Sequence, residues 1–347
     1  MNKLLIALSK NELSIEEQNE IQKQFEEEFN WCLFLGRLFY HKIQFRAWSH
    51  IKSYSLEKPV PQFVWRALEE HYNMVIMQKN IIIKELKKIV LELNKCGVKY
   101  ALLKGVPLEK QLFPSSGRES NDIDILVSRD DIKQLHNVLN KLGYKNSVSN
   151  SRQEEVYYLL NTHQTLPYKK AIITQKSSVT IDLQFALTLQ KQLKYNIDIK
   201  EIINNGIEFE MSNSSFRVLN SFYEFIMLCT HLYGEAILHS EICKGKDLQL
   251  SKIADIYEWI EKNFYDFDWE AQAFEIVKRN LTIPVVYSVK LVETIYKNFK
   301  ATKILEKFSV PNLEFMNEYR DENFNIKKWN KSVEARLFSD NLPKNIT

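Results

Sequence analysis

The stretch that decides the fold is Leu103–Val127, which reads LKGVPLEKQLFPSSGRESNDIDILV. It has the pattern of a strand end, a glycine turn, a short helix, a loop and a second strand. Asp122 and Asp124 are two residues apart in that otherwise apolar strand. Side chains two residues apart point to the same face of a sheet. Carboxylates crowded on one face resist ionisation unless a cation lies between them, so the pattern predicts a divalent metal, most simply Mg²⁺ with phosphates.

A third carboxylate lies further along the chain, in the apolar segment 179–185 (VTIDLQF). Strand alternation puts Asp182 on one face with Thr180 and Gln184. An aspartate in the middle of an apolar strand is costly to bury without a partner. The alternative is that Asp122 caps a turn while Asp124 or Asp182 faces solvent. Taken together, the three aspartates favour a metal site, with Asp122, Asp124 and Asp182 as its ligands.

Hydrophobic periodicity and turn residues predict the elements on either side of these strands. Ser14 and Glu17 fit a capping box at the start of a helix, and a long helix over 64–93 ends near Gly97. We expect strands at 98–103 and 122–127, mainly strands over 155–185, and a short pair at 207–210 and 216–219. Helices are expected at 107–113, 130–142, 221–238, 248–262, 268–280 and 284–298, with a partial helix near 329–337.

These elements predict an α+β protein, with a small mixed sheet flanked by helical regions at both ends. We expect four segments along the chain. They are an N-terminal helical region (1–96), a central α/β core (97–218), a C-terminal helical domain (219–300) and a partly ordered tail (301–347).

Composition limits the classes of protein to consider. The 347 residues are 45% hydrophobic and 26% charged, which is ordinary for a globular protein. No apolar run approaches the ~18 residues that span a bilayer, and the N-terminus has no signal-peptide pattern. Four scattered cysteines favour a reducing cytoplasm over a disulfide or zinc framework. The net charge of +3 permits an anionic substrate without requiring nucleic acid.

The order of motifs resembles a known superfamily. A strand ending at a Lys-Gly turn, a helix, Arg-x-Ser, the alternating Asp122 and Asp124, and a later strand aspartate are similar to the nucleotidyltransferase superfamily, which includes DNA polymerase beta. More narrowly, the pattern resembles the bacterial group of uncharacterised nucleotidyltransferases, and abortive-infection nucleotidyltransferase toxins have a similar signature. The resemblance covers about 97–185.

The resemblance implies roles for individual residues. Asp122 and Asp124 match the two metal ligands, and Asp182 matches the third carboxylate, which activates the acceptor hydroxyl. Gly105 matches a turn that lets the backbone approach the triphosphate, and Lys104 supplies a positive charge to it. No serine directly follows Gly105, unlike in the superfamily, so phosphate contacts are expected from Lys104, Arg118 and Ser120. Gln184 stands where the narrower group often has histidine.

The predicted activity is therefore transfer of a nucleoside monophosphate from a nucleoside triphosphate to an acceptor hydroxyl, with Mg²⁺ or Mn²⁺. Phosphate transfer on the same fold, and a catalytically silent nucleotide-binding or accessory protein, remain as alternatives. The acceptor, the preferred nucleotide and the oligomeric state are not specified by the sequence. No GxSxG or Walker A pattern appears, which disfavours serine hydrolases and P-loop kinases.

Overall fold

The computed structural model describes residues 1–146, 152–187 and 195–339 of the chain. These residues divide into two compact units. The sheet unit contains residues 73–111 and 119–227, whereas the helical unit contains 1–72, 112–118 and the described residues from 228 onward. The division into four segments that the sequence led us to expect stays a prediction.

The helical unit begins with four short helices and the first turns of a long one. Their bounds are α1 (Asn2–Leu8), α2 (Ile15–Glu26), α3 (Trp31–Tyr40), α4 (Gln44–Ser53) and α5 (Gln62–Lys95). The Ser14 hydroxyl accepts the Glu17 N–H at 3.2 Å, and the Glu17 carboxylate accepts the Ser14 N–H at 3.0 Å. The predicted capping box is therefore confirmed, and it satisfies two amide groups that a helix start leaves unpaired.

The C-terminal part of the chain, from Ser221 onward, is a succession of helices with a small hairpin before the last one. Its elements are α10 (Ser221–Ile237), α11 (His239–Cys243), α12 (Leu250–Asn263), α13 (Trp269–Lys278), α14 (Thr282–Tyr296), α15 (Phe299–Leu305), β8 (Glu318–Arg320), β9 (Ile326–Lys328) and α16 (Val333–Leu337). The four helices predicted between 221 and 298 are confirmed within a few residues at each end. Residues 340–347, the end of the expected tail, lie outside the described residues.

The sheet unit contains a seven-stranded sheet among the described residues, in the order β3-β4-β5-β2-β1-β7-β6. β2 pairs with β5 and β1 pairs with β7 in parallel, and the other neighbours are antiparallel. This mixed sheet confirms the predicted α+β class. The strands are β1 (Tyr100–Leu102), β2 (Asp122–Val127), β3 (Lys145–Asn146), β4 (Tyr168–Ile172), β5 (Ser177–Gln184), β6 (Ile207–Met211) and β7 (Ser214–Val218).

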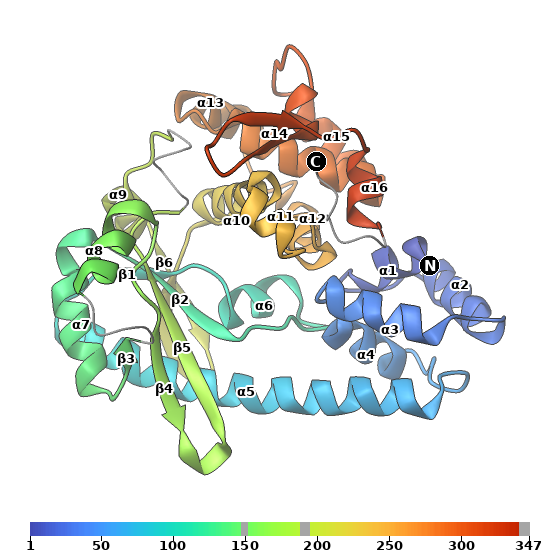
Figure 1. The fold of residues 1–347 in the computed structure, drawn as a ribbon, viewed down its shortest axis with the longest axis horizontal. Helices are drawn as coiled ribbons and strands as arrows, with labels where there is room; N and C mark the ends of the chain where they lie inside the picture. The colour runs from blue at the N-terminus through green and yellow to red at the C-terminus, as the bar shows by residue number, and fades with distance from the viewer. Residues whose placement is uncertain (147–151, 188–194, 340–347) are drawn as a thin grey trace. The chain divides into compact units, whose positions relative to one another are not determined.

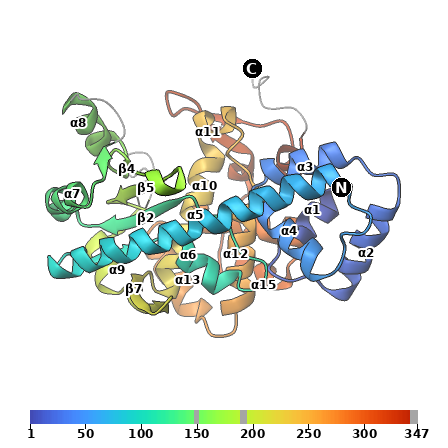
Figure 2. The ribbon, with the colours of Figure 1, turned by 90° about the horizontal axis from the view of Figure 1, so that it is seen from below.

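One face of this sheet forms the core of the unit. Alternate apolar residues of β2 and β5, such as Ile125 and Ile181, pack with the second half of α5 and with α7 (Ile132–Lys141). Figures 1 and 2 show these two helices beside the sheet. Because strand side chains alternate, the residues between these apolar ones must leave from the opposite face. That alternation carries the aspartates away from the core.

One predicted element is wrong. Residues 155–161 were expected to continue a run of strands, but they belong to helix α8 (Arg152–Asn161). Val156, Tyr157 and Tyr158 favour a strand by intrinsic preference. The segment also contains Leu159 and Leu160, good helix formers, and Val156, Tyr157 and Leu160 lie exposed on one side of the helix. The remaining helices of the sheet unit are α6 (Val106–Leu112) and α9 (Ile199–Asn204).

In the part of the chain that the structure describes, no helix has both the length and the apolar content needed to span a membrane. The long helix α5 is amphipathic, with buried residues such as Leu86 and Ile89 and exposed lysines such as Lys84 and Lys88.

Candidate active site

The parallel pairing of β2 and β5 brings the predicted carboxylates together. Asp124 lies directly opposite Asp182, and Asp122 lies opposite Thr180. All four residues leave from the face that the apolar core does not occupy, because their neighbours Ile123 and Ile181 belong to that core. The structure therefore places two carboxylates at the same level on adjacent strands, with a third at the beginning of β2.

Asp182 is the least compensated of the three. One of its carboxylate oxygens, Oδ1, is buried without a hydrogen-bond partner among the described residues. Burial, and then repulsion from Asp124 and Asp122, raise the pKa of Asp182 to about 7. Desolvation and nearby like charges both disfavour an ionised carboxyl group, and a cation placed between the aspartates would reverse both effects.

Asp124 is buried, and donors lie near both of its oxygens. The side-chain amide of Gln184 donates to Asp124 Oδ1 at 2.7 Å, and Lys104 Nζ lies 3.6 Å from Asp124 Oδ2. Gln184 is two residues beyond Asp182 on β5, so it shares the acidic face. The sequence placed Gln184 on that face, but it did not indicate that its amide would hold Asp124.

The Lys-Gly turn after β1 depends on glycine. Gly105 has a φ of +80°, and a Cβ atom added there would lie 3.1 Å from Ser120 Oγ. A side chain at that position would combine a left-handed backbone with a tight contact. The Gly105 carbonyl then accepts the Glu109 N–H at 3.1 Å in the first turn of α6. Lys104, Gly105 and Ser120 are thus gathered beside the start of β2.

A buried ion pair fixes the helix that follows this turn. Lys79 Nζ of α5 and Glu109 Oε1 of α6 are 2.6 Å apart, and both side chains are largely buried. Buried pairs of this kind are costly to break, because removing one partner leaves the other charge without compensation. The pair therefore holds α6, and the turn before it, against α5.

The acidic residues suit a hard cation that keeps some ligands of its own. In the described part of the chain, no three acidic, histidine or cysteine side chains already converge as a complete metal cage. Mg²⁺ is usually bound through one or two carboxylates, with water and substrate phosphates filling the other positions. The unpartnered Asp182 Oδ1 and the opposed Asp124 fit such an open site.

Arg118, which was expected to contact phosphate, has a carboxylate partner within the helical unit. Its Nε donates to Asp255 at 3.0 Å and its Nη2 donates at 2.8 Å. Arg46 Nη2 lies 3.7 Å from the same carboxylate. The structure thus brings Lys104, Gly105 and Ser120 together with the aspartates in one unit, whereas Arg118 belongs to the other unit.

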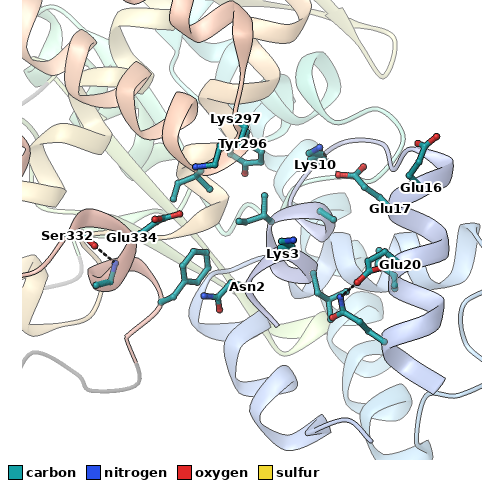
Figure 3. Close-up of a pocket in the computed structure, with 18 residues that line it drawn as sticks. Asn2, Lys3, Lys10, Glu16, Glu17, Glu20, Tyr296, Lys297, Ser332 and Glu334 are labelled. Carbon is teal, nitrogen blue, oxygen red and sulfur yellow. Dashed lines mark hydrogen bonds and ion pairs between the residues drawn. The ribbon is translucent and has the colours of Figure 1, made fainter. Parts of the chain in front are cut away.

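The helical unit also has a pocket of about 870 Å³, between α1, α2, the end of α14 and α16 (Figure 3). None of the predicted site residues lines it. Its charged side chains have both signs, and Lys10 is already paired with Glu17 at 2.7 Å. A nucleoside triphosphate would meet several carboxylates there, and their repulsion disfavours this pocket as the nucleotide site. The charged lining residues are Lys3, Lys10, Lys297, Glu16, Glu17, Glu20 and Glu334.

The mixed sheet and its strand-borne aspartates have the arrangement that the sequence led us to expect of a nucleotidyltransferase. Comparison with family sequence models agrees. The model of the family described as uncharacterised nucleotidyltransferase matches residues 27–297. The chain belongs to this family, and the resemblance stated from the sequence is confirmed. No curated protein sequence matches the chain.

Proposed function

We propose that this protein is a metal-dependent nucleotidyltransferase that moves a nucleoside monophosphate from a nucleoside triphosphate to an acceptor hydroxyl. The observation that carries the proposal is the direct opposition of Asp124 and Asp182 on adjacent parallel strands. Membership in a nucleotidyltransferase family supports it independently.

Each acidic residue has a role in this proposal. Asp122, Asp124 and Asp182 hold Mg²⁺ or Mn²⁺, because carboxylate oxygens are the ligands that hard cations prefer. When bound, the cation neutralises charge on the triphosphate and polarises the reacting oxygens. Asp182 also accepts the proton of the acceptor hydroxyl, because one of its carboxylate oxygens has no hydrogen-bond partner among the described residues. Gln184 keeps the Asp124 carboxylate oriented through its 2.7 Å hydrogen bond.

The phosphate contacts come from the turn after β1. Lys104 contributes a positive charge beside Asp124, and the Gly105 backbone lets the triphosphate approach closely. Ser120 lies against Gly105 and offers a hydroxyl. The Arg118 guanidinium, proposed from the sequence as a further phosphate ligand, is already held by the Asp255 carboxylate. Arg118 is therefore the weakest of the proposed phosphate ligands.

The reaction balances as a single displacement. The acceptor oxygen forms a bond to the α-phosphorus, the bond from that phosphorus to the bridging oxygen breaks, and pyrophosphate leaves. The acceptor proton passes to Asp182. No residue of the chain is modified in this scheme, so the protein returns to its starting state once Asp182 releases the proton.

The test uses a triphosphate labelled at the α-phosphate, with Mg²⁺, and a panel of acceptors. Wild-type protein should transfer the labelled monophosphate, and Asp122→Asn with Asp124→Asn should reduce transfer at least ~100-fold. Asp131→Asn, a conservative change of a half-buried aspartate elsewhere in the sheet unit, is the matched control and should retain activity. Unchanged transfer in the double variant would remove the proposal. A phosphotransferase would instead leave the label in the nucleoside diphosphate, and the mass of the acceptor would increase by phosphate alone.

A further inference from the structure

Two lysines lie in one row with the acidic site across the sheet. Lys145 of β3 pairs with Lys169 of β4, and Lys169 pairs with Thr180 of β5. Thr180 in turn lies opposite Asp122. Directly paired residues on neighbouring strands share a face. The row Lys145, Lys169, Thr180 and Asp122 therefore crosses the same face that carries the aspartates.

This row puts like charges against each other. Two lysines directly opposite in an antiparallel pair destabilise the pairing, and both are exposed. Among the side chains that the structure describes, no ion pair joins either lysine to an acidic residue. Lys170 and Lys200 of the same unit, by contrast, pair with Glu85 and Asp130. The two lysines of the row are thus a positive patch, without an ion-pair partner among the described side chains, beside the negative patch of the aspartates.

Protection of the sheet edge does not account for both lysines. β3 is the edge strand, and an exposed lysine there discourages pairing with another chain. Lys169 lies one strand further in, on β4, where β3 already covers the edge. Its charge also partly offsets the burial and carboxylate repulsion that raise the pKa of Asp182. Lys169 therefore interacts electrostatically with the acidic site, and protection of the sheet edge does not explain its position.

The order of strands puts these lysines on the far side of the aspartates from Lys104. Lys104 follows β1, the aspartates lie on β2 and β5, and the lysine pair lies on β4 and β3. Neighbouring strands are about 4.8 Å apart, so Lys169 is roughly two strand spacings, or about 10 Å, from Asp122. In phosphoryl transfer the attacking and leaving oxygens lie roughly in line. A triphosphate held beside Lys104 leaves the acceptor to enter from the side of Lys169.

We propose that Lys145 and Lys169 bind a phosphate group of the acceptor, so that the acceptor is a phosphate ester with a free hydroxyl. This inference rests on the proposed function, because it takes Asp182 as the group that activates that hydroxyl. Lysine is a point charge that binds phosphate without demanding a fixed geometry. A polynucleotide 3′ end and a small sugar phosphate share this chemistry, and the experiment separates them.

The experiment measures binding of two probes and of the donor. The probes are a single-stranded RNA with a free 3′-hydroxyl and a 5′ fluorophore, and ribose 5-phosphate, and the donor is Mg²⁺-ATP. Wild type is compared with Lys145→Gln/Lys169→Gln and with Lys133→Gln, an exposed lysine on α7, which packs on the other face of the sheet. Gel filtration of each protein checks that the variants do not associate through the edge.

The lysine pair should control the binding of whichever probe resembles the acceptor. For RNA, the slope of log affinity against log salt should fall by about 1.4, which is ~0.7 for each lost contact to a single strand. For ribose 5-phosphate, we expect about a tenfold loss of affinity. Lys133→Gln should change neither, and Mg²⁺-ATP should bind all three proteins equally. RNA binding alone identifies a polynucleotide acceptor, and sugar phosphate binding alone identifies a small one.

Three results would overturn the inference. Wild type could bind neither probe, the double variant could keep the wild-type slope and affinity, or it could lose Mg²⁺-ATP as strongly as the probes. The last result would assign the lysines to the donor. Failure of the proposed function has a different signature, since it removes Mg²⁺-dependent transfer from wild type while binding of the probes by the lysines persists.

Discussion

Both units of this protein bury a carboxylate among other charges, but they treat it differently. In the helical unit, Asp255 accepts hydrogen bonds from Arg118 and lies 3.7 Å from Arg46. In the sheet unit, Asp182 faces Asp124 and has an oxygen without a hydrogen-bond partner among the described residues. A buried carboxylate with its cations in place is costly to disrupt, whereas the Asp182 oxygen without a donor suits the cation that we propose.

Burial alone does not make such a site. Burial raises the pKa of Glu258, in the helical unit, to about 7, as it does for Asp182. The Glu258 carboxylate already accepts the Asn11 N–H at 2.7 Å, and no second carboxylate lies opposite it in a strand pairing. The distinguishing feature of the sheet unit is therefore the register that opposes two aspartates, whose repulsion adds to the effect of burial on the pKa of Asp182.

The largest expected effect on stability comes from breaking the compensated group. Asp255→Ala would leave the buried Arg46 guanidinium, which stacks 3.7 Å from the centre of the Phe113 ring, without its carboxylate. Removing one partner of a buried pair costs about 3–5 kcal/mol, which chemical denaturation would measure. Asp266→Ala, an exposed aspartate of the same unit, is the control and should cost less than ~0.5 kcal/mol. A loss below ~1 kcal/mol for Asp255→Ala would mean that the group is not compensated as we describe.

In the sheet unit, by contrast, removing the charge of a buried carboxylate should raise the free energy of unfolding. In metal-free buffer at pH 8, Asp182→Asn should stabilise the protein by about 1–3 kcal/mol, because it removes a charge that folding disfavours. The folded pKa of about 7 exceeds the ordinary 3.8, so the folded state holds the extra proton between these values. Wild-type stability should therefore fall as pH rises from about 4 to 7, and that contribution should vanish in the variant.

Adding Mg²⁺ distinguishes a metal site at the aspartates from a general effect of surface charge on stability. Mg²⁺ should stabilise wild type and not Asp182→Asn, and the variant should lose nucleotide transfer although it is more stable. Destabilisation of the metal-free protein by Asp182→Asn would contradict the proposed repulsion.

A buried histidine of the helical unit should respond to pH in the opposite direction. Burial lowers the pKa of His50 to about 4, although its ring contacts the Lys10 carbonyl at 2.9 Å. The unfolded chain then binds the proton first, near pH 6.5, and the folded state loses stability as pH falls toward 4. Between pH 7 and 5 this contribution amounts to about 1–2 kcal/mol. The free energy of unfolding of His50→Gln should depend less on pH over that range than that of wild type. An equal dependence would contradict the lowered pKa of His50.

The smallest changes in stability are expected at two glycines that differ in backbone conformation and in the space around them. Gly105→Ala should destabilise by about 1–2 kcal/mol, because its φ is +80° and its Cβ would lie 3.1 Å from Ser120 Oγ. Gly36→Ala, inside α3 with open space around it, should stabilise by about 0.5–1 kcal/mol. Gly105→Ala should also raise KM for the triphosphate. A KM equal to that of wild type would mean that the turn does not contact the donor triphosphate.

Local sequence pattern was sufficient for the central strand and its aspartates. The bounds of β2 agree with the predicted 122–127, because alternation and the flanking turn residues both act over a few positions. The partner of Arg118 could not be predicted, since Asp255 is 137 residues away in the chain. The lysine row was missed for the same reason, because pairing of Lys145 with Lys169 depends on the register of strands separated by α8. The strand expected at 155–161 failed where local preferences for strand and helix compete.

The central claim is that the opposed aspartates of β2 and β5 hold a divalent cation. Calorimetric titration of Mn²⁺ into the metal-free protein tests it most directly. Wild type should bind, Asp122→Asn/Asp124→Asn should not, and Asp131→Asn should bind as wild type does. Two results would contradict the account. One is equal Mn²⁺ binding by the wild-type protein and the double variant. The other is no Mn²⁺ binding by wild type, whether or not a nucleoside triphosphate is present.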